Sequence, residues 1–346
     1  MVEVSRGGIV ESSHQGVAAV ANVHGDVLAV WGSADHVTFL RSSAKPFQGI
    51  PLVESGAAAH YGLTEQELAI ICASHAGSDE HVAVIHSILQ KIGLGESDLR
   101  CGTHIPFDST TSRKLIAAGE EPTALRHNCS GKHAGMLALA QYLDAPIQTY
   151  LALDSPVQQL IMNTFAEMVS MKSGDIIVGI DGCSAPNFAV PMGKAAIAFA
   201  RLIDPGKFSS KRAESCRTIV KAMTAYPEMV SGEGRFDTRL MKVTSTRLLS
   251  KGGAEGFQGI GLPAESLEFG SPALGVVLKV LDGDVGNRAR SVATIALLEG
   301  IGVLPEQERA QLNGLDSRTI FNQSGLQVGE IRSPEAFQNV FSLPYD

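Results

Sequence analysis

Residues 39–47 read Phe-Leu-Arg-Ser-Ser-Ala-Lys-Pro-Phe. The prediction of the fold depends mainly on these residues. Ser42 and Lys45 are three residues apart, so their side chains face the same side if the segment begins a helix. A serine hydroxyl is a poor nucleophile at neutral pH, and a desolvated lysine held beside it can act as its base. Pro46 is tolerated in a first helical turn, although proline also disfavours helical angles at the residue before it. The stretch therefore predicts a Ser-Lys pair near the start of a helix.

A β-hairpin is predicted just before this stretch. Residues 17–22 (VAAVAN) and 27–31 (VLAVW) have the composition of strands, and His24-Gly25-Asp26 between them has that of a hairpin turn. A hairpin followed by Ser-x-x-Lys resembles the serine β-lactamases and penicillin-binding proteins. In that fold a Lys-Thr/Ser-Gly triad lies on the strand flanking the nucleophile. Lys251-Gly252-Gly253, just before a predicted strand, is a loose match that lacks the hydroxyl. The two motifs together favour the fold more than either does alone.

The middle of the chain is predicted to be helical, because apolar residues recur there at helical spacing. The predicted helices cover residues 47–55, 64–69, 79–92, 131–143, 156–171, 212–225 and 287–301, and further strands cover residues 175–180, 257–262 and 272–282. This order predicts an α+β protein, serine β-lactamase/penicillin-binding-protein-like, in which N- and C-terminal strands form one antiparallel sheet around a helical middle. We expect a single domain over residues 1–346.

The composition excludes several classes of partner. The 346 residues carry a net charge of −8, have no basic run and are only 5% aromatic, so we expect no nucleic-acid binding. No window of 18 residues is apolar and uncharged, and Glu3, Arg6 and Glu11 interrupt any signal-peptide core, so we expect no membrane contact. The five cysteines are too few and too scattered for a disulfide scaffold, which predicts a cytoplasmic protein with reduced thiols.

Two of the cysteines lie in glycine-bearing segments. Cys129 begins Cys-Ser-Gly-Lys-His-Ala-Gly (129–135), and Cys183 follows a predicted strand in Asp-Gly-Cys-Ser-Ala-Pro (181–186). The first segment resembles the end of a P-loop, but it lacks the earlier glycine and the hydroxyl residue after the lysine, so we reject nucleotide binding. Thiolates suit a soft metal such as zinc, on which the two segments can converge. Buried structural thiols are the alternative interpretation.

Six segments taken together resemble the rhizobial-type L-asparaginases, the third structural class of that activity. They are RSSAKP (41–46), CASH (72–75), HNCSGKHAG (127–135), DGCSAP (181–186), YPEMV (226–230) and SKGGAEG (250–256). These segments span nearly the whole chain, and their joint occurrence is specific. The sequence lacks the N-terminal Thr-Gly-Gly-Thr of the threonine-dependent bacterial asparaginases, and it shows no sign of the self-cleaving plant-type class.

The resemblance implies a β-lactamase-like fold, a homodimer, and hydrolysis of L-asparagine to L-aspartate and ammonia. It implies two Ser-Lys pairs, which are Ser42 with Lys45 and Ser74 with Lys251. It further implies a zinc ion bound by Cys129, Lys132 and Cys183. It makes Arg41, His133 and Asp181 candidates for substrate contacts or for support of the site.

The residues leave several alternatives open. Our choice of nucleophile is Ser42, and Ser74 with Lys251 is the competing assignment. The zinc is expected to organise the substrate pocket rather than to generate hydroxide, because the serines already supply a nucleophile. Two other functions are a serine hydrolase of the same fold that acts on β-lactams or peptides, and a non-catalytic protein that binds zinc or an amino acid. The missing signal peptide argues against the first, and retention of both serines and both lysines argues against the second.

Overall fold

The computed structural model describes residues 1–267 and 270–343, and the chain divides into two compact units. The first unit comprises residues 1–43, 190–204 and 239–346, and the second comprises residues 44–189 and 205–238. Our expectation of a single domain over the whole chain stays a prediction. No helix within the described ranges is long and apolar enough to cross a membrane.

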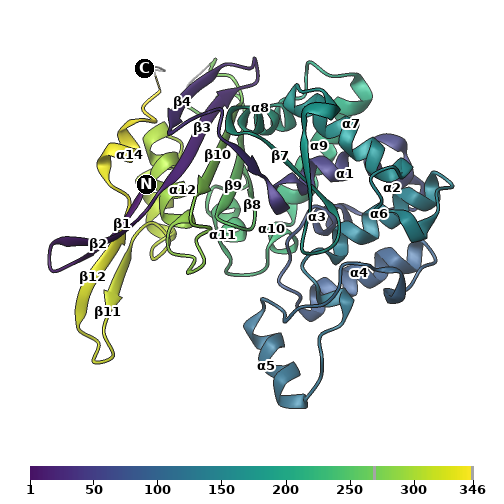
Figure 1. Cartoon of the computed structure of the whole chain (residues 1–346), viewed down its shortest axis with the longest axis horizontal. Helices are drawn as coiled ribbons and strands as arrows, with labels where there is room; N and C mark the ends of the chain where they lie inside the picture. The colour runs from purple at the N-terminus through teal and green to yellow at the C-terminus, as the bar shows by residue number, and fades with distance from the viewer. Residues whose placement is uncertain (268–269, 344–346) are drawn as a thin grey trace. The chain divides into compact units, whose positions relative to one another are not determined.

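The first unit is built around a five-stranded antiparallel sheet, with purple N-terminal strands beside green C-terminal ones in Figure 1. The order is β4-β3-β10-β9-β8. The bounds are Gly16–Asn22 for β3, Val27–Trp31 for β4, Leu249–Gly252 for β8, Phe257–Leu262 for β9 and Leu274–Val280 for β10. Every residue of β3 is buried, as expected of an inner strand. The predicted α+β class is therefore confirmed, with both ends of the chain contributing to one sheet. The hairpin that precedes Ser42 is also confirmed.

Helix α8 (Met192–Ile203) packs directly against this sheet. A Cβ atom at Gly275 of β10 would lie 1.8 Å from the carbonyl oxygen of Ala196 and 2.5 Å from the backbone nitrogen of Ala200. Glycine is therefore required at this position, because any side chain would push the helix off the strand. The helix was not predicted from the sequence, although most of its residues are buried.

A second antiparallel sheet in the first unit was also not predicted. Its order is β11-β12-β1-β2. The bounds are Val2–Arg6 for β1, Ile9–His14 for β2, Arg318–Phe321 for β11 and Gln327–Arg332 for β12. Strands β2, β11 and β12 are short and largely exposed or half-buried, so they lack the apolar run that identifies a strand. In β1 Val2 and Val4 are buried and alternate with Glu3 and Ser5, a pattern too short to have been recognised. The remaining elements of this unit are β5 (Val37–Phe39), α12 (Arg290–Ile301), α13 (Glu306–Gln311) and α14 (Glu335–Asn339).

The second unit is mainly helical. Its helices are α1 (Lys45–Ser55), α2 (Ala57–His60), α3 (Glu65–Ile71), α4 (Asp79–Lys91), α5 (Ser109–Ala118), α6 (Ser130–Tyr142), α7 (Pro156–Val169), α9 (Ser210–Ala225) and α10 (Pro227–Val230). α11 (Phe236–Val243) begins in this unit and ends in the first. Local signals account for several helix starts, since Thr64 and Glu67 form a capping box at α3 and Ser155 caps α7.

The strand β6 (Ile177–Ile180) pairs with β7 (Pro186–Pro191) in antiparallel fashion. The strand that we predicted over residues 175–180 is apolar throughout residues 176–180, a pattern that indicates a buried strand, and this indication of burial was wrong. β6 lies at the edge of its sheet, and the side chains of Ile177 and Ile180 are 56% and 68% exposed. An apolar run does not distinguish an edge strand from a central one.

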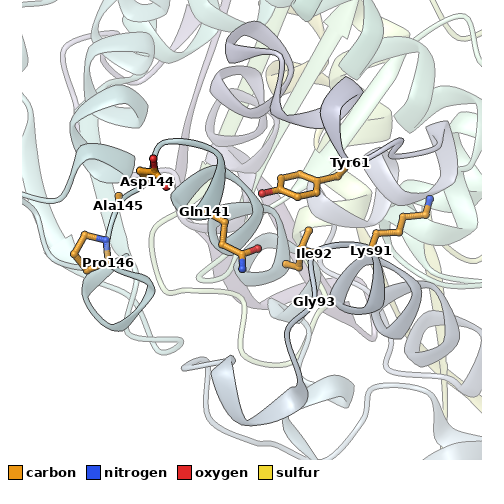
Figure 2. Close-up of a pocket in the computed structure, with 8 residues that line it drawn as sticks. All are labelled: Tyr61, Lys91, Ile92, Gly93, Gln141, Asp144, Ala145 and Pro146. Atoms are coloured by element: carbon orange, nitrogen blue, oxygen red, sulfur yellow. The ribbon is translucent and has the colours of Figure 1, made fainter.

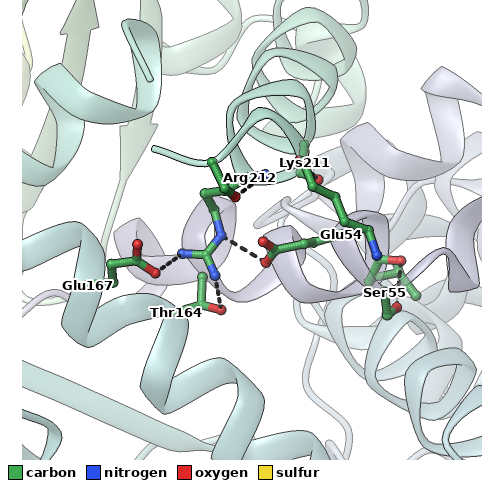
Figure 3. A network of polar contacts seen from close by, with 9 residues as sticks. Glu54, Ser55, Thr164, Glu167, Lys211 and Arg212 are labelled. Carbon is green, nitrogen blue, oxygen red and sulfur yellow. Dashed lines mark hydrogen bonds and ion pairs between the residues drawn. The ribbon is translucent and has the colours of Figure 1, made fainter. Parts of the chain in front are cut away.

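A cluster of charges joins three helices of the second unit (Figure 3). Arg212 of α9 donates from Nε to Glu54 of α1 at 2.8 Å, and from Nη1 to Glu167 of α7 at 2.7 Å. Its Nη2 lies 3.4 Å from the hydroxyl of Thr164. The arginine is only 9% exposed, so water does not readily replace it as a partner of the two carboxylates.

We expect Arg212→Leu to lower the free energy of unfolding by about 2 kcal/mol. This loss of unfolding free energy is smaller than the loss expected when a fully buried ion pair is broken, because Glu167 is half exposed. The matched control is Arg217→Leu on the same helix, whose pair with Glu214 spans 3.5 Å and is exposed. That control should cost well under ~1 kcal/mol. Urea unfolding followed by circular dichroism measures both, and equal losses in the two variants would contradict the prediction.

Candidate active site

The first unit holds Ser42 and Lys251 on neighbouring segments. Ser42 lies in a single 3₁₀ turn (Arg41–Ala44) that leads directly into α1. Lys251 precedes the predicted strand, which is β9, and itself lies in β8, a strand that we did not predict. The hydroxyl of Ser43 donates to the backbone carbonyl of Lys251 at 2.6 Å, so the turn is fastened to the strand. Lys251 is fully buried, and its Nζ donates to the carbonyl of Gly252 at 2.7 Å.

Arg41 begins this turn in an unusual backbone conformation. Its φ angle is +51°, which is uncommon for a residue with a side chain and recurs at functional sites. Its guanidinium lies 3.9 Å from the carboxylate of Glu255. The conformation directs the chain into the turn that carries Ser42.

The second unit joins Lys45 to Ser74. Lys45 is the first residue of α1 and is almost completely buried. Its Nζ lies 3.2 Å from the hydroxyl oxygen of Ser74, and it donates to the carbonyls of Ala73 at 2.5 Å and Asn128 at 3.1 Å. The sequence had paired Ser74 with Lys251, so the contact between Ser74 and Lys45 is a pairing that the motifs did not predict.

Cys129, Lys132 and Cys183, which we call the thiol–amine cluster, also meet in the second unit. Cys129 is the N-cap of α6, Lys132 lies in the first turn of that helix, and Cys183 follows β6. The Nζ of Lys132 donates to the sulfur of Cys183 at 3.0 Å. All three side chains are buried.

Electrostatics within the thiol–amine cluster favour one thiolate and one ammonium. A hydrogen bond from Cys183, together with Lys45 and Lys132, outweighs burial and holds the pKa of Cys129 well below its usual value. The same hydrogen bond and burial raise the pKa of Cys183. Burial works to lower the pKa of Lys132, but the two sulfurs and Asp181 outweigh it and raise this pKa. The Ser74–Lys45 pair lies close to the cluster, because Lys45 donates to the carbonyl of Asn128, the residue directly before Cys129.

His133 and Asp181 both lie beside the cluster. His133 is fully buried, and its Nδ1 is 2.6 Å from the hydroxyl of Tyr150. Its Nε2 is buried without a hydrogen-bond partner among the described residues. Burial and Lys132 hold the pKa of His133 well below its usual value. Asp181 accepts a hydrogen bond from the backbone of Gly182 at 2.9 Å.

Close packing of α6 on α3 brings the thiol–amine cluster to the end of α3. A Cβ atom at Gly131 would lie 2.2 Å from the carbonyl oxygen of Ile70, so the first turn of α6 touches the backbone of α3. Gly131 is the first residue of the helix that we predicted over residues 131–143. It allows two helices to approach more closely than any side chain permits.

We expect Gly131→Ala to lower the free energy of unfolding by about 1–3 kcal/mol, because the added methyl group would overlap a backbone atom that cannot rotate away. Gly174→Ala is the control, since a Cβ atom there meets no atom within 4 Å. The control should stay within ~0.5 kcal/mol of the unmodified protein. The measurement is the urea midpoint of each variant, and an unchanged midpoint for Gly131→Ala would show that the helices can separate freely.

Several residues at the site were missed by sequence reasoning. They are Ser43, which fastens the Ser42 turn, Asn128, whose carbonyl accepts from Lys45, and His75 and Ser130, which bond to each other. All four lie inside the segments that carry the family resemblance. Their position within these segments was therefore the feature of the sequence that could have identified them as site residues.

A hollow of about 710 Å³ lies elsewhere in the second unit (Figure 2). It is lined at the C-terminal ends of α4 and α6 by Tyr61, Lys91, Ile92, Gly93, Gln141, Asp144, Ala145 and Pro146. None of the candidate residues lines it, so it is separate from the site described above.

Comparison with known proteins identifies the family. The sequence profile of L-asparaginase II matches residues 2–333. No curated protein matches significantly. A crystal structure of Mglu in its native form has 15% identity and a TM-score of 0.44, over 88% of this chain and 70% of that one.

Two further solved structures are similar at a low level. The native form of Mglu in 4.3M NaCl has 16% identity and a TM-score of 0.43, over 86% of this chain. This chain spans 64% of that protein's length. The Bacillus subtilis glutaminase YbgJ, in covalent complex with 5-oxo-L-norleucine, has 12% identity and a TM-score of 0.35, over 81% of this chain and 84% of that one. The match of the family profile to nearly the whole sequence carries the assignment, and the chain belongs to the L-asparaginase II family.

Proposed function

We propose that this protein is an amidohydrolase that converts L-asparagine to L-aspartate and ammonia. The observation that carries the proposal is the buried contact between Lys45 and Ser74, 3.2 Å apart and beside the thiol–amine cluster, in a chain of the L-asparaginase II family. A hydroxyl within hydrogen-bond reach of a buried amine is the arrangement that nucleophilic amide hydrolysis requires.

The partners of Lys45 suit a base. A neutral amine has two N–H groups and one lone pair. Lys45 donates to the carbonyls of Ala73 and Asn128 and to the hydroxyl oxygen of Ser74, so loss of the proton shared with Ser74 would leave a neutral amine whose lone pair faces that hydroxyl. When Lys45 is neutral, a proton can therefore move between its Nζ and the oxygen of Ser74.

The two serines then have different roles. Ser42, three residues before Lys45, attacks the side-chain amide carbon, and its proton passes through the hydroxyl of Ser74 to Lys45. Lys45 returns that proton through the hydroxyl of Ser74 to the amide nitrogen, which leaves as ammonia. Water then hydrolyses the aspartyl ester and regenerates Ser42. Backbone N–H groups near Ser42 stabilise the oxyanion, an effect worth ~3 kcal/mol for each donor.

The substrate has charged groups that require partners. A guanidinium can bind a carboxylate through two parallel hydrogen bonds, so Arg41 is our candidate for the α-carboxylate of asparagine. Asp181 is the candidate for the α-ammonium, and His133 supports the site through Tyr150. Lys251 adds a further buried amine on β8. We further propose that the protein acts as a homodimer in the cytoplasm.

The thiol–amine cluster fits a zinc ion. Two thiol sulfurs and an amine nitrogen are donors that zinc accepts, and three protein ligands leave one position for water or substrate. No group of three or more His, Cys, Asp or Glu side chains in the described part of the chain could hold a metal, so Lys132 is needed as the third donor. Lys132 must lose its proton on binding. Bound zinc would supply a positive charge that orients the substrate.

We expect Cys129→Ser to bring the zinc content of the purified protein from about one ion per chain to a small fraction of that. Cys216→Ser is the matched control, because Cys216 is an equally buried thiol of α9 outside the cluster. Its zinc content should match that of the unmodified protein. Elemental analysis of dialysed samples provides the measurement. Full zinc retention in Cys129→Ser would remove this residue from the ligand set.

The activity itself is tested by ammonia release from L-asparagine, with L-glutamine assayed alongside. Turnover of either substrate supports an amidohydrolase, and the ratio of the two rates gives the side-chain preference. Turnover of nitrocefin without turnover of either amino acid would assign the protein to a β-lactam hydrolase of the same fold. Binding of asparagine without ammonia release would make it a non-catalytic binder.

A further inference from the structure

We propose that His75 is a positioning residue that couples the loop carrying Ser74 to the start of α6, and so holds Ser74 in register with the thiol–amine cluster. This inference deepens the proposed function and rests on it, because that function makes Ser74 and the cluster parts of one site. His75 belongs to neither Ser-Lys pair and is not a ligand of the cluster.

The hydrogen bonds of His75 fix its tautomer. The backbone N–H of Gly77 donates to Nδ1 at 3.1 Å, so the ring proton must be on Nε2. Nε2 lies 3.0 Å from the hydroxyl oxygen of Ser130, and that hydroxyl donates onward to the carbonyl of Leu125 at 2.8 Å. Nε2 is therefore the donor to Ser130. In this series of hydrogen bonds, which runs from Gly77 to Leu125, each donor and each acceptor is fixed.

The bond between His75 and Ser130 is inaccessible to water. Both side chains are 0% exposed. The ring of His75 also stacks on that of His81, with centroids 5.1 Å apart. Burial, followed by His81 and Lys45, holds the pKa of His75 well below its usual value, so the ring stays neutral. A buried hydrogen bond of this kind cannot be replaced by solvent when one partner is lost.

The side chains of Lys45 and His75 both connect the loop of residues 72–78 to the segment of residues 127–131. Lys45 contacts Ala73 and Ser74 on one side and Asn128 on the other. His75, the residue after Ser74, makes a similar connection, because it bonds to Ser130, two residues after Asn128. Under the proposed mechanism Lys45 gains and loses a proton in each cycle, so its contacts change during turnover. The bridge from His75 keeps its protons, and it can hold the two segments together while Lys45 reacts.

Other bonds of the loop lead elsewhere. The backbone N–H of Ser74 donates to the carbonyl of Val230 at 2.9 Å, and the carbonyl of Ala76 accepts from the N–H of Asp108 at 2.9 Å. These contacts tie the loop to α10 and to the segment before α5. The loop is also tied toward the start of α6 by Arg126, whose Nη1 donates to the carbonyl of Gly77 at 2.9 Å. Lys45 and His75 are the side chains that reach α6 and the residues just before it from the two positions next to each other, Ser74 and His75.

The test uses three variants of the full chain. His75→Phe removes both ring nitrogens and should lower kcat for ammonia release by about 10- to 100-fold, with KM nearly unchanged. His75→Gln retains an N–H donor near the position of Nε2 and should recover most of the loss. Adding Ser130→Ala to His75→Phe should lower kcat no further, because the two residues act through one bond.

Amide hydrogen exchange reports the coupling without any substrate. In His75→Phe, residues 72–78 and 127–131 should exchange faster together, while α12 keeps its protection. The control is Ser209→Ala, which removes the N-cap of α9 and costs comparable stability. It should loosen α9 and leave kcat unchanged.

Specific results would overturn the proposal. These are a normal kcat in His75→Phe, an equal loss of kcat in Ser209→Ala, or faster exchange in only one of the two segments. If the unmodified protein releases no ammonia from asparagine or glutamine, the proposed function fails. In that case the amide exchange of residues 72–78 and 127–131 still tests whether His75 couples the two segments.

Discussion

Ser42→Ala is expected to lower kcat for asparagine by about four to six orders of magnitude, because removal of a covalent nucleophile leaves only binding and oxyanion stabilisation. Ser74→Ala is expected to cost less, about 10²- to 10⁴-fold, because it removes a proton-transfer step rather than the atom that attacks. The two variants together assign the roles of the serines.

Mass spectrometry of acid-quenched turnover mixtures measures the intermediate directly. In the unmodified protein the aspartyl ester should be found on the peptide that contains Ser42. Ser74→Ala should accumulate the same adduct or form it slowly, and Ser42→Ala should form none. An adduct on the peptide that contains Ser74 would reverse the assignment, which the 3.2 Å contact with Lys45 makes the leading alternative.

Lys45→Met is expected to lower kcat by about 10³- to 10⁴-fold. The change keeps the length and apolar character of the buried side chain but removes the proton acceptor and the bonds to Ala73 and Asn128. Lys45→Arg should be equally inactive, since a guanidinium is always charged and cannot accept a proton. A purely electrostatic role for Lys45 would instead predict that arginine restores turnover.

Chemical rescue separates loss of the base from loss of structure. Small primary amines added to Lys45→Ala should restore part of the activity, because they can occupy the vacated space and accept a proton. Lys221→Met is the control for a change of net charge, because Lys221 is exposed on α9. Its kcat should equal that of the unmodified protein. Failure of every amine, together with full activity in Lys45→Met, would exclude Lys45 as the base.

The sequence patterns predicted those structural features that are determined by residues close together in the sequence. The β3–β4 hairpin was predicted almost to the residue, because an unbroken apolar run and a glycine turn specify it locally. The capping box of α3 is a local feature of the same kind, because Thr64 and Glu67 are three residues apart in the sequence. The Ser-x-x-Lys motif correctly indicated the fold, since the hairpin before it and the strand that carries Lys251 occur in one sheet.

The partner of Ser74 could not be predicted in the same way. Its loop is placed by contacts with Val230 and with the segment around Asn128, both remote in sequence. Which lysine reaches its hydroxyl is therefore a property of tertiary packing. The approach of α6 to α3 at Gly131 is similar, because a glycine in a sequence does not reveal which backbone will lie against it. The exposure of Ile177 also depends on neighbours rather than on its own segment.

The order of strands in the five-stranded sheet has a consequence for how the chain folds on the ribosome. Strand β3 lies beside β10, where Gly16 pairs with Val280. β3 can pair with β4 as soon as both are made, but its other edge must wait until the chain has been synthesised as far as residue 280. The helical unit, whose last residues are 205–238, can close earlier. Long loop closure slows such pairing, so β3 is a segment that holdase chaperones should protect in nascent chains.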